Sequence, residues 1–466
     1  MKLSKAPNMR TAIIALIALI AVSSGVTAFA AEIKVTDTAS LRACVSGNTI
    51  PGVSSSPDVG RTAGPGDTCV VFDGVYNLVA VPLVVSVENL IVRSMNGATA
   101  TIIQGEYNGA LISIIVRGVT FGGPAPDQGF TVTNRDVGNG IGLCVTDDRT
   151  GGVLEAPCNV PLATTDIIPG DLPAGVEPDV ATITPTGAGV AQENITIQNN
   201  RFLNNGEEGV VFTYNNLTAI DTIRVLTNEF RMNGGEGLVF GHGTGAIGRR
   251  GLDRNVVIEG NTFDRNVQAN EDNLTNTSAG LPAFPNDCDA TGPDVRQAHI
   301  RFCNFGTVEH VAILNNTILL AGGPQTVVGT RADGILFDIG IIEIRDLLID
   351  RNVIHQNTRN GIKFDYFGRL GENVVISNNA RGVQGITQNG PAPALLPAEG
   401  NGIYITSRIT EVRNVQFVNN VINGNRGLYN GLQDTDLTDA YLPSEGVSDP
   451  PPADPRYKPC RDGNGI

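Results

Sequence analysis

Charged and aromatic side chains recur at equivalent places in short apolar segments of the second half of the chain. The segments share two apolar residues separated by one position: Ile300-Arg301-Phe302, Ile335-Leu336-Phe337-Asp338, Ile362-Lys363-Phe364-Asp365 and Ile403-Tyr404-Ile405. Apolar residues at a period of two are typical of β-strands, in which successive side chains point to opposite faces. We therefore expect Arg301, Lys363 and Tyr404 in one outward column that begins with Val211 and Val239, and Asp338 and Asp365 in the next column.

The two aspartates are the residues best suited to chemistry. If Asp338 and Asp365 lie on neighbouring strands, their backbones are about 4.8 Å apart. Like charges that close raise the pKa of one carboxyl or recruit a cation, for which we expect Ca²⁺. Two carboxylates also suit the acid and the nucleophile or base of a glycoside hydrolase. The alternative is that Asp and Lys on an outward strand face only make that face soluble.

A second acidic motif lies upstream. Asp287-Cys288-Asp289-Ala-Thr-Gly292 matches the start of a calcium-binding loop, with Asp287 and Asp289 as ligands. Ala298 stands where the closing glutamate of such a loop is expected, so the alternative is an acidic surface loop tied by a disulfide.

The elements that position these residues are read from a repeat. Its marker is an asparagine with Phe or Ile two residues later, and it occurs at Asn200, Asn228, Asn261, Asn316, Asn352 and Asn420, with a degraded copy at Asn378-Asn379. Self-similarity at this length predicts a solenoid, whose turns bury their apolar edges only by stacking. We expect parallel strands, with one buried column made of Phe202, Phe230, Phe263, Ile318, Ile354 and Ile422. The asparagines should adopt left-handed backbone conformations and pass amide hydrogen bonds from turn to turn.

This pattern resembles the right-handed parallel β-helix, or pectin-lyase-like, superfamily over roughly residues 50 to 430. The segment Gly64-Pro-Gly-Asp-Thr-Cys-Val-Val-Phe-Asp-Gly-Val-Tyr76 resembles the first coil of pectate-lyase-like and alginate-lyase-like proteins. The resemblance implies an all-β fold. It does not imply one function, because the superfamily holds lyases, hydrolases, epimerases and adhesins. By likeness to β-helix lyases, Lys363 would be the base, Arg301 or calcium would neutralise a uronate, and Tyr404 would stack on a sugar.

Gly241-His242-Gly243 resembles the GHG element of polygalacturonases, which would make His242 a substrate-binding residue. The Asn-Thr-Asp triplet and paired aspartates of that family are missing at the right place upstream, and a turn residue is the alternative.

The N-terminus has the features of a secretory signal peptide over residues 1–30. Lys2, Lys5 and Arg10 precede an apolar run, and Ala28-Phe29-Ala30 forms a small-residue cleavage site before Ala31. A membrane anchor is the alternative, but the run is short and no later segment reaches the roughly 18 apolar residues of a spanning helix. We therefore expect a secreted, periplasmic or cell-surface protein without membrane insertion after cleavage. The net charge of −15 argues against nucleic acid as a partner.

The seven cysteines of an exported chain should mostly pair. Neighbours in sequence suggest Cys44 with Cys69, Cys144 with Cys158 and Cys288 with Cys303, which leaves Cys460 over. No Cys-x-x-Cys motif supports a thiolate metal site.

The predicted organisation is a signal peptide, a cap over 31–48 and a β-helix over 49–432, followed by an acidic, proline-rich tail over 433–466. Thr36 or Asp37 is the candidate N-cap of a short helix over 35–46 that buries Leu41 and Val45. Long insertions are expected near 146–192, 268–297 and 382–400. For function, we expect a protein that binds or cleaves a polysaccharide along the outward face, with lyase chemistry as one form. The alternative is a non-catalytic, adhesin-like rod.

Overall fold

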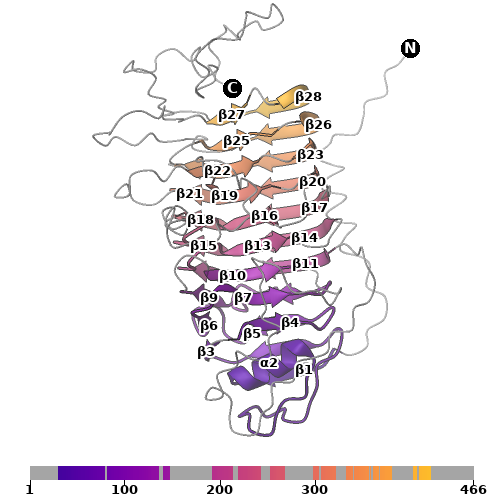
Figure 1. The fold of residues 1–466 in the computed structure, drawn as a ribbon, viewed down its shortest axis with the longest axis vertical. Coiled ribbons are helices and arrows are strands. Elements are labelled where there is room, and N and C mark those ends of the chain that lie inside the picture. The colour runs from indigo at the N-terminus through magenta and orange to yellow at the C-terminus, as the bar shows by residue number, and fades with distance from the viewer. Residues whose placement is uncertain are drawn as a thin grey trace, which may run out of the picture.

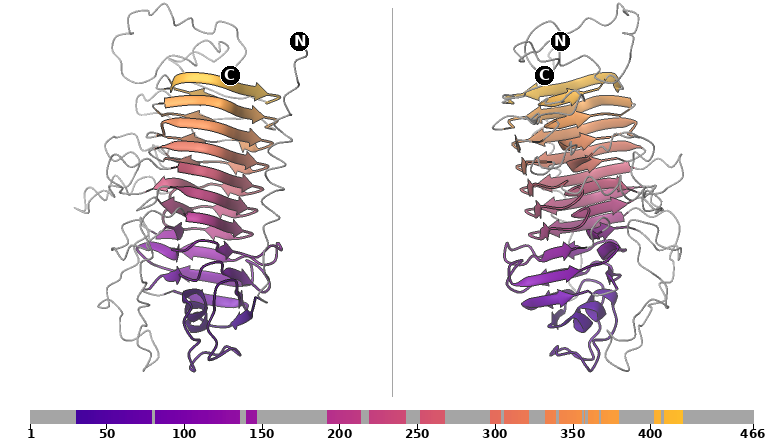
Figure 2. Two further views of the ribbon diagram at one scale, coloured as in Figure 1. Left: turned by 90° about the vertical axis from the view of Figure 1, so that its right-hand side faces the viewer. Right: turned by 60° about the vertical axis from the view of Figure 1, so that its left-hand side comes forward.

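The protein is a coil of short strands that stack along one long axis (Figure 1). The computed structural model describes residues 30–78, 81–135, 140–146, 192–213, 219–242, 252–267, 297–303, 306–321, 332–338, 341–355, 357, 360–366, 368–379, 402–406 and 409–420. Every pairing between the named strands is parallel, and the strands form three sheets, to all of which the central turns contribute. The predicted right-handed parallel β-helix is confirmed, and both views of Figure 2 show successive turns above one another.

The three sheets differ in the length of their strands. The eleven-stranded sheet is formed by β1 (Glu32–Val35), β2 (Thr68–Val71), β5 (Ile91–Ser94), β8 (Thr120–Phe121), β11 (Gln192–Gln198), β14 (Ile220–Leu226), β17 (Leu252–Glu259), β20 (Thr307–Leu314), β23 (Glu343–Asp350), β26 (Gly368–Ser377) and β28 (Ile409–Val418). It includes the two longest of the named strands, β26 and β28. The nine-stranded sheet is formed by β4 (Leu83–Val85), β7 (Gly109–Ile114), β10 (Gly140–Val145), β13 (Val210–Thr213), β16 (Leu238–His242), β19 (Gln297–Phe302), β22 (Ala332–Phe337), β25 (Ile362–Phe364) and β27 (Ile403–Ile405). The eight-stranded sheet is formed by β3 (Gly74–Asn77), β6 (Thr101–Gly105), β9 (Thr131–Asn134), β12 (Arg201–Leu203), β15 (Glu229–Arg231), β18 (Thr262–Asp264), β21 (Thr317–Leu319) and β24 (Val353–His355).

The predicted apolar column runs through the interior. Phe202, Phe230 and Phe263 stack with ring centroids 5.2 and 4.7 Å apart, and Ile318 and Ile354 continue in register. Ile422 lies outside the described residues. A second interior column, on the nine-stranded sheet, stacks its rings at centroid distances of 4.7 to 5.1 Å: Phe212, Phe240, Phe302, Phe337 and Phe364. Because each ring is buried by the turns above and below, the core exists only as a stack.

The predicted asparagine ladder is present and continuous. In each step the backbone N–H and side-chain amide of one asparagine donate to Oδ1 of the next, through Asn200, Asn228, Asn261, Asn316, Asn352, Asn379 and Asn420. Asn379 is therefore a full member of the ladder rather than part of a degraded copy.

The expectation that the ladder asparagines themselves are left-handed is wrong. The left-handed residue is the one immediately before each of them: Asn199, Thr227, Gly260, Asn315, Arg351, Asn378 and Asn419. The chain turns the corner at this preceding residue. The ladder asparagine follows it, and its side-chain amide points into the stack.

A second ladder crosses the other corner of the coil. It runs from Asn134 through Asn205 and Asn233 to Asn266, again with each Oδ1 accepting from the previous backbone N–H. At the next turn Ala321 occupies the ladder position, and its backbone N–H donates to Oδ1 of Asn357.

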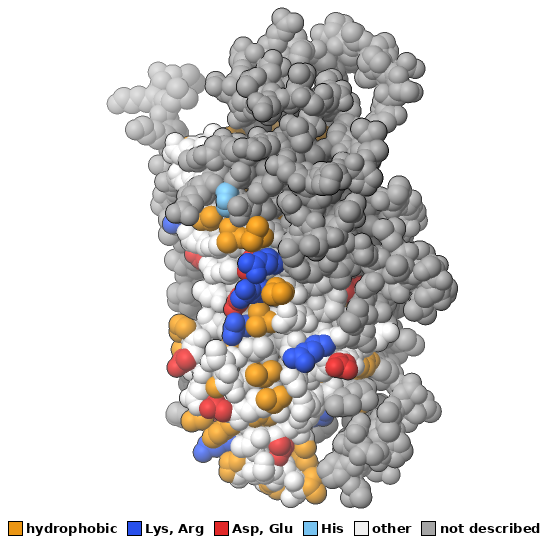
Figure 3. All heavy atoms as spheres, turned by 90° about the vertical axis from the view of Figure 1, so that its left-hand side faces the viewer, with side chains coloured by type: hydrophobic (Ala, Val, Ile, Leu, Met, Phe, Trp, Pro, Cys, Tyr) orange, Lys and Arg blue, Asp and Glu red, His pale blue; other side chains and the backbone are white. Residues whose placement is uncertain are grey.

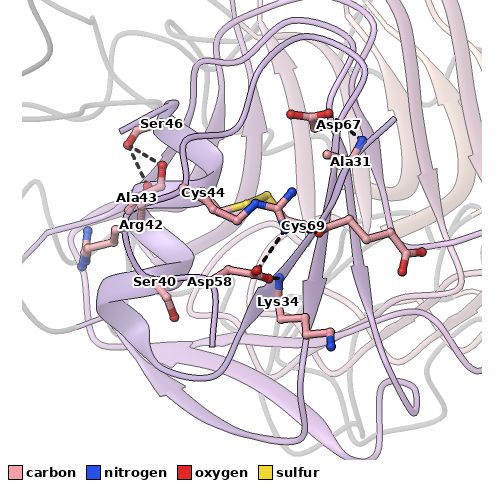
Figure 4. Close-up of a disulfide and its surroundings, with 12 residues drawn as sticks. Ala31, Lys34, Ser40, Arg42, Ala43, Cys44, Ser46, Asp58, Asp67 and Cys69 are labelled. Carbon is pink, nitrogen blue, oxygen red and sulfur yellow. Dashed lines mark hydrogen bonds and ion pairs between the residues drawn. A yellow bond between two sulfur atoms is a disulfide. The ribbon is translucent and has the colours of Figure 1, made fainter. Parts of the chain in front are cut away.

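The expected N-terminal helix is α2 (Thr38–Ser46), which lies at the indigo end of the stack (Figure 1). Asp37 is its N-cap and forms a capping box with Ser40, while Leu41 and Val45 are buried in the core. These hydrogen bonds hold the pKa of Asp37 at about 2, against the opposing effect of its partial burial. The predicted disulfide between Cys44 and Cys69 joins this helix to β2 (Figure 4).

Cys144 and Cys303 are also disulfide-bonded. Cys158, Cys288 and Cys460 lie outside the described part of the chain, as do the predicted signal peptide up to residue 29, most of each insertion, and the tail. Among the described residues, no helix is long and apolar enough to cross a membrane.

Candidate functional site

The predicted site residues share the outward face of the nine-stranded sheet. Strand register aligns one column in the expected order: Val211, Val239, Arg301, Leu336, Lys363 and Tyr404. Asp338 and Asp365 directly follow the paired Phe337 and Phe364, and their backbone N–H groups donate to Phe302 and Phe337 at 2.8 Å each. The two aspartates therefore lie on the same face of neighbouring turns.

The expectation that this face is open to solvent is wrong. Arg301 is 3% exposed, Lys363 1% and Asp338 0%. Val211 and Val239 are also buried. Together with Cys144 and Cys303 they belong to an apolar cluster that is separate from the interior of the coil. Alternation in the sequence tells which side of the sheet a residue occupies, but it carries no information about what lies over that side.

The buried charges form two groups of ion pairs. Arg301 contacts Oδ2 of Asp338 through Nε at 3.0 Å and Nη2 at 2.7 Å, and its Nη1 is 3.1 Å from Oε1 of Glu236. Lys363 Nζ is 3.0 Å from Oδ2 of Asp365 and 5.6 Å from the ring centroid of Tyr404. Each cation that was predicted for the site thus has a carboxylate partner within the protein, and Tyr404 lies beside Lys363 as expected.

A third column of polar residues was missed in the sequence. It stands three positions before the column that runs from Val211 to Tyr404, and it contains Glu208, Glu236, Asp333 and Asn360, with Ala298 paired to Asp333 in the same register. The missed signal is a repeated acid or amide before glycine, as in Glu236-Gly237-Leu238 and Asp333-Gly334-Ile335. Asp333 Oδ1 accepts from the backbone N–H and side-chain amide of Asn360, both at 2.8 Å. Glu236 is the functional candidate in this column, because it forms an ion pair with Arg301.

These buried charges differ from those on a solvated face. Figure 3 shows Lys and Arg side chains in a short row with acidic ones beside it on the exposed surface. On the eight-stranded sheet, Arg201 pairs with Glu229 and Arg231 with Asp264, and the Arg231 side chain is 40% exposed. Solubility therefore explains the charges of the eight-stranded sheet, whereas it does not explain Arg301, Lys363 and their partners.

The residues described do not fit a calcium site. Calcium takes six to eight oxygen ligands, whereas Asp338 and Asp365 each contact a cationic side chain. Within the described ranges no group of three or more His, Cys, Asp or Glu residues could hold a metal ion. Asp287 and Asp289 lie outside those ranges. His242 ends β16, where its backbone pairs with Thr213 across a register shift.

No known protein family and no curated protein matches the sequence. Solved structures that resemble the chain include ORF18 of Geobacillus virus E2, with 10% identity and a TM-score of 0.34 over 89% of this chain and 65% of that one. The Agl-KA catalytic domain has 15% identity and a TM-score of 0.30, over 78% of this chain and 62% of that one. Tailspike protein 2 from Escherichia coli O157:H7 bacteriophage CAB120 has 12% identity and a TM-score of 0.30, over 73% and 42%. The chain spans less than two thirds of each of these structures, and likeness at this level carries no inference about activity.

Proposed function

We propose that this protein is exported and binds a polysaccharide at the outward face of the nine-stranded sheet, where Tyr404 is partly exposed in the same column as the buried Arg301 and Lys363. The supporting observation is a contrast within one column. Val211, Val239 and Leu336 fill the same register with apolar side chains, so the fold does not need a cation there. A buried ion pair is at best about as stabilising as apolar residues of the same volume. Paired charges at such positions are therefore candidates for a functional site.

The composition of this face suits a carbohydrate. Tyr404 is half-buried and offers an apolar ring with a polar tip. Arginine, lysine and carboxylate groups donate to or accept from hydroxyl groups. Successive turns repeat equivalent positions about every 4.8 Å. Lys363 and Tyr404 lie on adjacent turns, and so do Asp338 and Asp365 in the next column, so this end of the face presents polar groups at the spacing along which we propose that a linear polymer lies.

The charge balance favours a neutral polysaccharide. Within the ion pairs of the described residues, Glu236, Asp338 and Asp365 contribute three negative charges, against two positive charges from Arg301 and Lys363. A uronate would meet a surplus of carboxylates, with the cations already paired. A neutral sugar adds no charge to a buried cluster, where an uncompensated charge is costly.

If the protein is catalytic, the ion pairs favour hydrolysis over elimination. An ammonium in an ion pair has no lone pair with which to accept a proton, and Lys363 contacts Asp365 in this way. This disfavours Lys363 as the base of a lyase. Hydrolysis uses two carboxylates, and Asp338 and Asp365 on neighbouring turns supply them.

The test is a binding and turnover assay on a panel of neutral and uronate polysaccharides. Binding is measured by affinity electrophoresis, hydrolysis by new reducing ends and elimination by unsaturated uronate absorbance. The informative variant combines Lys363→Leu with Asp365→Thr, because Leu336 and Thr406 hold the equivalent positions in other turns. We expect a folded protein that no longer binds. Arg231→Met, on the exposed eight-stranded sheet, is the matched control and should bind normally.

The burial of Asp338 and Lys363 favours a second candidate, a non-catalytic rod whose charges fix the packing of this face. In that case neither the wild type nor the double variant would bind any polysaccharide of the panel, and the double variant would change only the unfolding midpoint.

A further inference from the structure

The residue immediately before the first strand, Ala31, donates its backbone N–H to a carboxylate. The backbone N–H of Ala31 donates to Oδ1 of Asp67 at 2.8 Å, and Oδ2 of Asp67 accepts from the backbone N–H of Gly64 at 2.9 Å. The carbonyl of Ala31 accepts from Thr68 N at 2.9 Å. Ala31 is thereby fixed at both its N–H and its C=O, and Figure 4 shows its contact with Asp67 near the disulfide of Cys44 and Cys69.

Asp67 differs from the neighbouring acids in its partners. Glu32 pairs with Arg93 at 2.8 Å, and Asp58 pairs with Arg61 at 2.9 Å while also accepting from the backbone N–H of Lys34. Among the described residues, no Lys or Arg side chain contacts the Asp67 carboxylate. The Asp67 carboxylate accepts from two backbone N–H groups and contacts no cationic side chain of the described residues. A positive charge on the Ala31 nitrogen would therefore give this carboxylate a cationic partner.

The Ala31 nitrogen is also the atom that cleavage of the predicted signal peptide would release. Ala28-Phe29-Ala30 is the small-residue cleavage pattern, and Ala30 is exposed where it precedes the strand. We propose that Asp67 is the binding site for the new α-ammonium group of Ala31, so that maturation adds an ion pair between the chain terminus and the first turn. The proposal rests on the predicted leader and is independent of the polysaccharide site.

The covalent step is hydrolysis of one peptide bond. Water adds across the bond between Ala30 and Ala31 with the exporting cell's leader peptidase as catalyst, leaving a carboxylate on Ala30 and an ammonium on Ala31. The neutral N–H donor at Asp67 becomes a charged donor, and charge-assisted hydrogen bonds are about twice as strong as neutral ones. The pairing of β1 with β2, which begins one residue later, is anchored more firmly after cleavage.

The first measurement is the N-terminal residue of the exported protein, by intact mass and N-terminal sequencing. We expect Ala31. A mature terminus at any other residue would overturn the proposal, because the ammonium would then lie away from Asp67.

The second measurement is the pKa of the Ala31 α-ammonium, followed by NMR of mature protein carrying ¹⁵N-alanine. A free α-amino group has a pKa of about 7.7 to 8.0, and an opposite charge in contact raises it, here by about one unit or more. Asp67→Asn should return the pKa to the free range, whereas Glu32→Gln should leave it raised. An unshifted pKa in the wild type would contradict the proposal, even if Asp67→Asn failed to fold.

The third measurement uses a mature chain with one extra glycine before Ala31, which moves the ammonium by one residue. Asp67→Asn should lower the thermal midpoint of the normal mature chain by several degrees more than that of the extended chain. Equal losses in the two backgrounds would assign Asp67 a role in holding Gly64 alone.

Discussion

The imidazole of His299 fills the space that Ala321 leaves in the second asparagine ladder. Nδ1 of His299 accepts from the Asn266 amide at 2.9 Å, and Nε2–H donates to the carbonyl of Leu319 at 2.7 Å. The neighbouring strands have glycine in this register, Gly237 and Gly334. A Cβ added at Gly237 would lie 3.1 Å from the ladder amide of Asn266. Glycine opposite asparagine and histidine opposite alanine are therefore two ways of filling the same corner.

This relationship predicts a compensating pair of substitutions. His299→Gly should destabilise by about 2 to 4 kcal/mol, because it leaves a cavity and removes the partner of a buried amide. Ala321→Asn alone should also destabilise, because two side chains then compete for one space. The double variant restores the arrangement of the other turns. Its loss of unfolding free energy should be smaller, by at least about 1 kcal/mol, than the sum of the losses in the two single variants. Additive losses in a denaturant-unfolding cycle would show that the two positions are independent.

The same histidine predicts acid sensitivity. Burial lowers the pKa of His299 from 6.5 to about 3. Between these values the unfolded chain binds a proton that the folded chain does not, so stability should fall as the pH drops from about 6.5 towards 3. The double variant His299→Gly with Ala321→Asn should show a shallower dependence of the unfolding midpoint on pH in this range.

Replacing an asparagine of the first ladder by alanine should lower the stability of the protein. Asn228 donates to the carbonyl of Ile197 at 2.8 Å and accepts from the backbone N–H of Asn200 at 2.9 Å, inside the stack. Asn228→Ala should therefore cost roughly 1 to 3 kcal/mol, because buried partners are left unpaired, and Asn352→Ala should behave alike. Asn96→Ala is the matched control, because that amide bonds to Asp73 at the surface. Equal midpoints for the ladder and control variants would remove the ladder as a source of stability.

We predict that six of the seven cysteines form disulfides. Cys44, Cys69, Cys144 and Cys303 are bonded, and Cys158 and Cys288 are the predicted partners of the last two. Thiol titration of the denatured, unreduced protein should find at most one free thiol, which we assign to Cys460. Peptide mapping without reductant then tests the two pairings. Three or more free thiols would contradict both the pairings and export to an oxidising compartment.

The sequence by itself determined the stack and its register. Alternating apolar residues and regularly placed asparagines are local patterns, and each turn can be buried only by a neighbour with the same pattern. The column from Val211 to Tyr404 and the ladder from Asn200 to Asn420 could therefore be written down before any coordinates.

Only the tertiary structure decided what the charged residues contact and how far they are buried. Arg301 meets Glu236, 65 residues earlier, and Asp338, 37 residues later, and no local period links those distances. The exchange of glycine for His299 likewise makes sense only beside Ala321 in the following turn. Periodicity in a sequence reports the face of a strand, whereas burial and ion pairing depend on segments brought together by stacking, whose spacing along the chain varies with every insertion.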